Sequence, residues 1–431
     1  MSLPLKRACA RLLLATLAVT PVAFASSVET CAPPPSPVSL SQAVQRALCA
    51  NPSLRGYQFE LAAAQANSDR ARAAYLPSVT AGYSKQRLDA GGETSQRQVA
   101  LNWLLYDFGG RSATYDAAKA SAAAASSVLA DQAQSLALDV AQGYFQLQAN
   151  EAAVDAALAQ EAASKHALEL ATARHKAGEA IRLDVLQAQS ALSQATVART
   201  RAVAAVATSR AYLAMLLDVP AESSAGLKLA GFADEVGKAP PQALADLVLQ
   251  AKSARADLRA GQEQLRALRS QAEAARAAHL PTVSLVGNLG RTTAAAGPSV
   301  SSNSIGINVS IPLFAGGATQ AQARALTAQA DAQEQRLHSA TNRAGYDVVS
   351  TYQTLLAASD QLAAASTLAE SARAALDQAV ARYRAGVGAM LEVFDSLSKR
   401  ASAEETLISS RLNLQLARVQ LARSLGQMPV Q

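Results

Sequence analysis

The chain has 431 residues and a formal net charge of +6, and half of its residues are apolar although only 4% are aromatic. Much of the apolar fraction is alanine, which favours long, closely packed helices over a globular domain with a bulky core. Three of the basic residues fall in a predicted signal peptide, so the net charge of the remaining chain is about +3, and a nucleic-acid partner is not indicated.

The N-terminus has the pattern of a secretory signal peptide. Basic residues and an apolar run are followed by Ala-Phe-Ala at 23–25, the small-x-small pattern of a cleavage site. The run is shorter than the roughly 20 residues needed to span a membrane, so cleavage is favoured over a retained anchor. We therefore assign residues 1–25 to the signal peptide and residues 26–37 to an N-terminal periplasmic segment.

Two cysteines remain after the predicted cleavage. An exported chain meets an oxidising environment, where Cys31 and Cys49 can pair. We favour a disulfide between them over the alternative of two free thiols.

Residues 38–230 form a first predicted unit. A helical part is followed by strands at about 77–88 and 97–107 and by long helices over about 111–217. Within the helical part, Asn51-Pro52 offers an N-cap followed by a first-turn proline, which predicts a fresh helix start.

Residues 231–426 form a second unit of the same plan, before a tail at 427–431. The expected elements are a helix at about 241–279, strands at about 281–291 and 303–313, and long helices over about 317–425. Landmarks of different kinds recur in order between the units at offsets of about 204 to 208 residues, which low-complexity alanine runs do not reproduce. The strand–helix junctions provide most of these landmarks, namely Pro77, Gly109 and Gly110 in the first unit and Pro281, Pro312, Gly316 and Gly317 in the second.

The predicted strands alternate strictly between apolar and polar residues. In the last strand Ile305, Ile307 and Val309 alternate with glycine, Asn308 and serine. One face in lipid and one in water is the requirement for an outer-membrane strand, although a soluble sheet can alternate equally well. Export favours the membrane. Four strands cannot close a barrel, and an open edge cannot lie in lipid, so we predict that three copies share a twelve-strand barrel.

Two glycine-containing breaks interrupt the long helices at equivalent positions. "RHKAGEAIRLDV" begins at Arg174 and "RYRAGVGAMLEV" begins at Arg382, so that Gly178 corresponds to Gly386. A glycine costs roughly 1 kcal/mol inside a helix, which indicates turns at these points.

Hairpins entered through "YLP", left through "LYDFGGR" or "PLFAGG", and followed by long helices with this R-x-x-x-G turn resemble the TolC outer-membrane factor family over residues 38–426. The resemblance implies a mixed α/β fold: a trimeric twelve-strand outer-membrane β-barrel continuous with a periplasmic helical barrel. It also implies an exit duct for type I secretion or tripartite efflux. The implied partners are a periplasmic adaptor (membrane fusion protein) and an inner-membrane transporter of the ABC or RND type.

The same resemblance implies roles for residues near the two turns. Glu392 and Asp395 match acids of the periplasmic gate, and Tyr383 and Asp184 match residues that hold the closed entrance. The turns themselves match the tip where adaptors dock, and they contain Arg174, Gly178, Arg382, Gly386 and Gly388. Gly388 stands where a well-known member has an arginine that bonds across the gate, so this sequence departs from the family's pattern at the position of that latch.

The sequence contains no phosphate-binding loop, dinucleotide fingerprint, zinc-protease motif or paired C-x-x-C. The four histidines are scattered, so no convergent catalytic or metal-ligating set is visible, and we expect no enzyme, cofactor or metal. The alternative function is a periplasmic structural or adaptor protein built on helical hairpins without a membrane barrel.

Overall fold

The computed structural model describes residues 37–87, 92–230, 243–294 and 298–428. The described residues all belong to one compact unit. The predicted signal peptide and Cys31 lie outside the described residues, so the signal peptide and the Cys31–Cys49 disulfide stay predictions.

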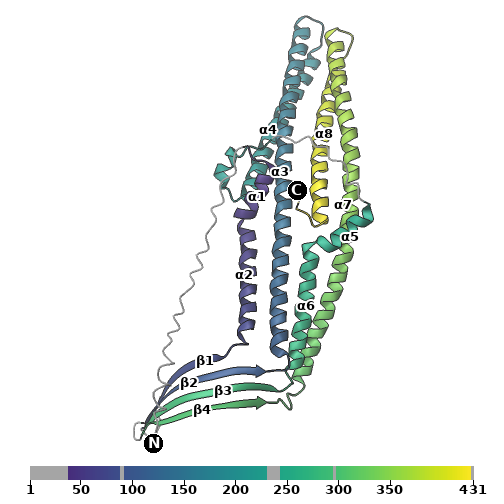
Figure 1. The fold of residues 1–431 in the computed structure, drawn as a ribbon. Helices are drawn as coiled ribbons and strands as arrows, with labels where there is room; N and C mark the ends of the chain where they lie inside the picture. The colour runs from purple at the N-terminus through teal and green to yellow at the C-terminus, as the bar shows by residue number, and fades with distance from the viewer. Residues whose placement is uncertain (1–36, 88–91, 231–242, 295–297, 429–431) are drawn as a thin grey trace. The chain divides into compact units, whose positions relative to one another are not determined.

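The first half of the unit contains six main elements and a 3-10 turn (Figure 1). They are α1 (Leu40–Ala50), α2 (Pro52–Ala73), β1 (Ser78–Arg87), β2 (Glu93–Tyr106), α3 (Gly110–Lys176), α4 (Arg182–Leu216) and η1 (Ala221–Gly226).

The second half repeats the order of the main elements. They are α5 (Leu244–Ala254), α6 (Ala256–Ala277), β3 (Thr282–Ala294), β4 (Val300–Ser310), α7 (Ala318–Arg384) and α8 (Met390–Ser424). Corresponding helices have equal lengths of 11, 22, 67 and 35 residues.

The short helices of each half are divided by a single extended residue. In the first half Asn51 caps α2 by accepting hydrogen bonds from the amides of Ser53 and Leu54, at the place where the asparagine–proline pair predicts a helix start. In the second half the prediction of one helix over 241–279 is wrong. Arg255 is extended there, with φ −64° and ψ 128°, and separates α5 from α6. No proline or glycine marks this break in the sequence.

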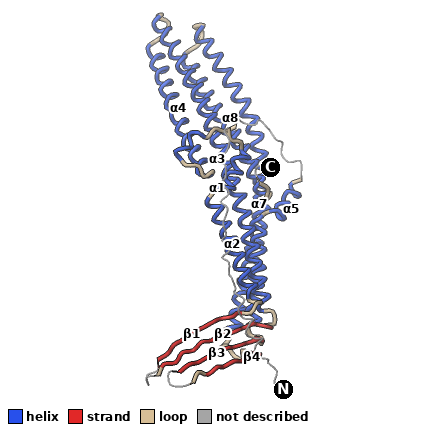
Figure 2. Tube along the Cα trace, turned by 60° about the vertical axis from the view of Figure 1, so that its left-hand side comes forward, coloured by secondary structure: helices blue, strands red, loops and turns tan. Residues whose placement is uncertain are grey.

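The four strands form one antiparallel sheet in the order β1-β2-β3-β4, drawn in red in Figure 2. The β2–β3 pairing joins the two halves of the chain. The predicted strand at 303–313 is wrong at both ends, because β4 runs from Val300 to Ser310. Pro312 has no amide hydrogen to extend the ladder. β2 and β3 extend beyond their predicted hairpin ends, to Glu93 and Ala294.

The strand register aligns the apolar positions of all four strands on one face of the sheet. Leu285 lies between Trp103 and Ile307, and Leu101 is opposite Val79. The other face carries mainly serine, threonine, glutamine, asparagine and glycine. Among the described residues neither β1 nor β4 has a strand on its outer edge, so the sheet is open at both sides.

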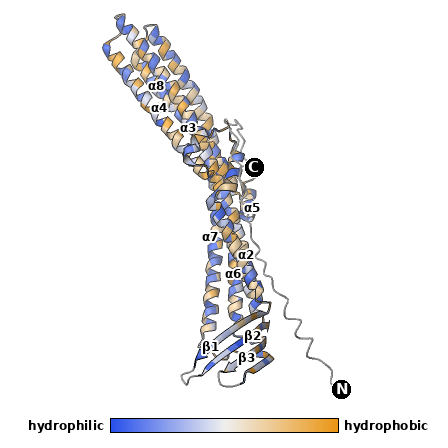
Figure 3. Ribbon diagram, turned by 90° about the vertical axis from the view of Figure 1, so that its left-hand side faces the viewer, coloured by the Kyte–Doolittle hydropathy of each residue, from blue (hydrophilic) through white to orange (hydrophobic). Residues whose placement is uncertain are grey.

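The helices pack mainly through small residues. Alanine dominates the buried positions of α3 and α7, and larger side chains gather in separate clusters along the helices. Hydrophobic and hydrophilic residues are interspersed along the helices (Figure 3), and no helix in the described ranges is long and apolar enough to cross a membrane.

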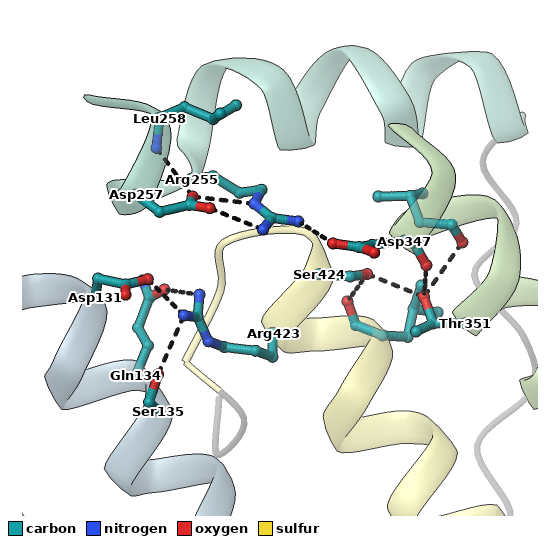
Figure 4. A network of polar contacts seen from close by, with 12 residues as sticks. Asp131, Gln134, Ser135, Arg255, Asp257, Leu258, Asp347, Thr351, Arg423 and Ser424 are labelled. Atoms are coloured by element: carbon teal, nitrogen blue, oxygen red, sulfur yellow. Dashed lines mark hydrogen bonds and ion pairs between the residues drawn. The ribbon is translucent and has the colours of Figure 1, made fainter. Parts of the chain in front are cut away.

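A polar network fixes the C-terminal end of α8 against α3 (Figure 4). The guanidinium of Arg423 contacts the Asp131 carboxylate at 2.5 Å and donates hydrogen bonds to Gln134 and Ser135. Nearby, Arg255 at the α5–α6 break binds Asp257 and reaches Asp347 of α7 at 3.0 Å. The break that the sequence does not reveal is therefore held by a contact between distant residues.

Candidate functional site: the tips of the long helical hairpins

The turns that close the two long hairpins have the same backbone geometry. After α3, the amide of Gly178 donates to the carbonyl of His175 and that of Glu179 to Arg174. After α7, the amides of Gly386 and Val387 donate to Tyr383 and Arg382 in the same way. This is the Schellman motif, which requires a left-handed residue at its centre.

Glycine satisfies that requirement in both turns. Gly178 has φ +77° and Gly386 has φ +80°, a region that disfavours residues with a Cβ. Gly388 has no positive φ and is needed for a different reason. A Cβ there would lie 3.0 Å from the Cβ of Arg382 and 3.1 Å from the amide nitrogen of Tyr383.

Arg174 connects the tip of one hairpin to the tip of the other. Its Nη1 donates to the carbonyl oxygen of Tyr383 at 2.6 Å, and its guanidinium lies 4.6 Å from the centre of the Tyr383 ring. Its Nε is 3.4 Å from the carboxylate of Glu179, which is exposed. Because Arg174 lies in the last turn of α3 and Tyr383 in the last turn of α7, this side chain links the tips of the two hairpins.

Tyr383 is the centre of this contact and is only 2% exposed. It belongs to a hydrophobic cluster that contains residues of all four long helices, including Ala171, Ala188, Leu376 and Val393. Burial raises the pKa of the Tyr383 hydroxyl, and the negative charge of Asp184 raises it further, so the phenol is neutral. The hydroxyl has no hydrogen-bond partner among the described residues.

The acidic residues at the start of α8 lie on one exposed face of that helix. Glu392 is 3.5 Å from Arg382 within its own hairpin, and Asp395 is 2.7 Å from Lys399 one turn along. Both pairs are about half exposed. The structure thus brings Arg174, Tyr383 and Asp184 together and leaves the two predicted gate acids accessible.

Each tip also presents apolar side chains to solvent, a feature that our sequence reasoning missed. Ile181 and Leu183 are 64% and 53% exposed at the first tip, and Val387 and Leu391 are 71% and 69% exposed at the second. The signal in the sequence is a leucine before each acid, in Leu183-Asp184 and Leu391-Glu392. Exposed apolar residues that gather in this way mark interaction surfaces.

The predicted strand–helix junctions lie at the other end of the long helices. Pro77 and Pro281 precede β1 and β3, and Pro312 follows β4. Gly109 and Gly317 are left-handed N-caps of α3 and α7, with φ +95° and +80°. The remaining two junction glycines are Gly110, the first residue of α3, and Gly316, with φ +61°.

The first junction contains a polar contact set that has no counterpart among the described residues of the second. Arg111 donates to the carbonyl oxygens of Leu104 and Leu105, and its backbone amide donates to Asp107. Trp103 donates from its indole nitrogen to the carbonyl of Tyr75 at 2.9 Å. Counted from the N-cap glycines Gly109 and Gly317, Arg111 and Asp107 correspond to Thr319 and Ala315 in the second half, which carry neither charge.

Groups of three or more histidine, cysteine, aspartate or glutamate residues arranged to hold a metal ion do not occur within the described part of the chain. The described residues of the tips therefore offer exposed apolar side chains and charged groups for binding a partner.

Comparison with known proteins identifies the family of the chain. A family model described as outer membrane efflux protein matches residues 43–218 and 247–427. The chain belongs to this family. Protein CyaE of Bordetella pertussis is 31% identical over 428 residues, with 95% of this chain and 90% of the relative covered. A probable efflux pump outer membrane protein, TtgC of Pseudomonas putida, is 28% identical, with 90% and 83% covered.

Solved structures of outer-membrane channels share the fold. The outer-membrane channel OprN superposes with a TM-score of 0.80 at 26% identity, covering 90% of this chain and 89% of that one. The open state of the MtrE outer membrane channel of Neisseria gonorrhoeae gives 0.77 at 23% identity, covering 90% and 89%. The predicted resemblance and the predicted outer-membrane localisation are confirmed. TtgC is named as an outer membrane protein, and OprN and MtrE are named as outer-membrane channels.

Proposed function

We propose that the protein is the exit duct of a type I secretion system or tripartite efflux pump. Three copies form a twelve-strand barrel in the outer membrane that continues into a periplasmic helical tunnel. A periplasmic adaptor and an inner-membrane transporter of the ABC or RND type deliver substrate to its tip.

The open sheet carries this proposal. It has one apolar and one polar face, and both of its edges lack a partner strand among the described residues. Backbone groups cannot be left without partners in lipid, so the edges must pair with further copies of the chain. Two copies would give eight strands, whose interior is filled by side chains, whereas three leave a conduit.

The internal repeat supports the same assembly. Helices of equal length in the two halves let each chain supply two similar sectors of the tunnel wall. At about 1.5 Å per residue, the 67 residues of α3 extend roughly 100 Å, which suits a tunnel through the periplasm.

The tips form the entrance in this proposal. Glu392 and Asp395 from three chains surround a narrow pore, and the Arg174–Tyr383 contact beside Asp184 holds the hairpins closed. The exposed apolar residues of the tip turns, together with Arg174, Gly178, Arg382, Gly386 and Gly388, form the surface where the adaptor docks. An adaptor opens the entrance only by binding the open form more tightly.

Outer-membrane fractionation, cross-linking and planar-bilayer recording of the purified protein test the proposal together. We expect outer-membrane location, heat-modifiable migration on a gel, a cross-linked trimer and a conducting pore. A soluble periplasmic protein with no conductance would instead support the alternative of a helical-hairpin adaptor. Co-purification after cross-linking in cells that carry either an ABC or an RND transporter distinguishes secretion from efflux.

A further inference from the structure

The hairpin end of the sheet carries basic residues that the duct does not require. The four strands contain Lys85, Arg87, Arg97 and Arg291 but only one acid, Glu93. Glu93 pairs with Lys85 at 2.8 Å and with Arg87 at 3.3 Å. Among the described residues no carboxylate therefore pairs with Arg97 or Arg291.

These two arginines face each other across neighbouring strands. Arg97 of β2 and Arg291 of β3 are directly opposite in the register. Like charges at opposite positions of an antiparallel pair destabilise it, unless an anion lies between them. The guanidinium of Arg97 lies 5.9 Å from the ring centre of Tyr83, and that of Arg291 donates to Ser299 at 2.8 Å, so both side chains are held in place.

The arginines border a groove with an apolar floor. The groove has a volume of about 710 Å³ and is lined by Tyr83, Arg97, Val99, Leu289, Arg291 and Asn303, among others. Strand alternation puts these six side chains on the apolar face of the sheet. Val99 and Leu289 are 40% and 51% exposed on the helix side of the arginines.

A neighbouring copy of the chain does not neutralise this pair by strand pairing. Further strands can join only at the outer edges of β1 and β4, whereas the arginines lie on the two inner strands. The groove faces the lipid if the apolar face does, and its basic rim lies at the end of the strands away from the helices.

We propose that this groove binds a lipid with an anionic phosphate headgroup in the outer leaflet. The phosphate lies between Arg97 and Arg291, where planar guanidinium groups form charge-assisted hydrogen bonds with its oxygens, and the acyl chains cover Val99 and Leu289. The inference rests on the proposed barrel, because only that assembly turns the apolar face toward lipid.

Native mass spectrometry of the delipidated full-length protein in neutral detergent tests the proposal. The probes are phosphatidic acid, phosphatidylcholine and inorganic phosphate. We expect the wild type to retain phosphatidic acid in preference to phosphatidylcholine. In Arg97→Gln/Arg291→Gln the ratio of the two bound lipids should fall at least about tenfold, since two charge-assisted contacts are removed. Inorganic phosphate at equal concentration should not displace the lipid.

Lys85→Gln/Arg87→Gln is the matched control. It removes the same charge from the same end and face of the sheet, but its side chains already pair with Glu93. An equal loss in the control, an unchanged preference in the arginine variant, or full displacement by inorganic phosphate would overturn the proposal. Heat-modifiable migration and conductance of the same samples report separately on barrel assembly, so failure of the duct is distinguishable from failure of lipid binding.

Discussion

Replacing Arg174 by alanine should loosen the closed tip without unfolding the long hairpins. The substitution removes a charge-assisted hydrogen bond of 2.6 Å to the carbonyl of Tyr383 and a cation–π contact at 4.6 Å. The pair with exposed Glu179 contributes little because water screens it.

Together these losses amount to about 2 to 3 kcal/mol. If they act on the closed form alone, the ratio of released to closed tips rises roughly 30- to 140-fold in each chain, and the proposed entrance contains three such tips. Planar-bilayer recording of the purified variant should therefore show a higher open probability or conductance. The open probability or conductance of Arg174→Lys should lie between those of the wild type and the alanine variant, because lysine keeps the charge but not the planar donor geometry.

Arg382→Ala is the matched control. It removes one positive charge at the equivalent position of the second hairpin, but its contact with Glu392 lies within that hairpin and is about half exposed. A current increase as large as that of Arg174→Ala would show that charge, and not the link between hairpins, controls the entrance. An Arg174→Ala channel that conducts like wild type would refute the reasoning.

Three further predictions concern the lipid face of the sheet, the entrance, and the ion pair between Arg255 and Asp257 at the start of α6. Ile307→Lys should lower the stability of the inserted barrel by roughly 2 to 4 kcal/mol near mid-membrane, and Asn308→Lys should lower it much less. Equal trimer yields for the two variants would contradict the assignment of the lipid face. Glu392→Gln/Asp395→Asn should abolish cation selectivity and block by multivalent cations in bilayer recordings while the trimer stays intact; selectivity that survives would move the gate elsewhere. Burial opposes ionisation of Asp257, but the hydrogen bonds and charge of its arginine partner outweigh it and lower its pKa. The ionised carboxylate thus stabilises the fold above the unfolded pKa of about 3.9, and this contribution is lost as pH falls through the lower folded value. Asp257→Asn should lower the free energy of unfolding by about 1 to 2 kcal/mol at neutral pH, after allowance for the 34% exposure of the side chain. Thermal unfolding should show a smaller difference between the variant and the wild type below pH 4.

The sequence by itself determined the features that depend on neighbouring residues. Strand alternation follows from a period of two, so the apolar set of β4 could be predicted before its partners were known. The turns at Gly178 and Gly386 depend on a backbone conformation that glycine adopts without strain. Asn51 supplies its own cap to α2. The order of these local signals was also enough to indicate the family.

Only the tertiary structure decided which distant residues meet. The break at Arg255 depends on Asp347, 92 residues away, and the end of α8 depends on Asp131, 292 residues away. Arg174 and Tyr383 are 209 residues apart, and their contact requires α3 and α7 to end at the same level. Arg97 faces Arg291 only because β2 pairs with β3 in one register. Such contacts depend on how helices pack and strands align over many residues, and a short stretch of sequence does not specify that alignment.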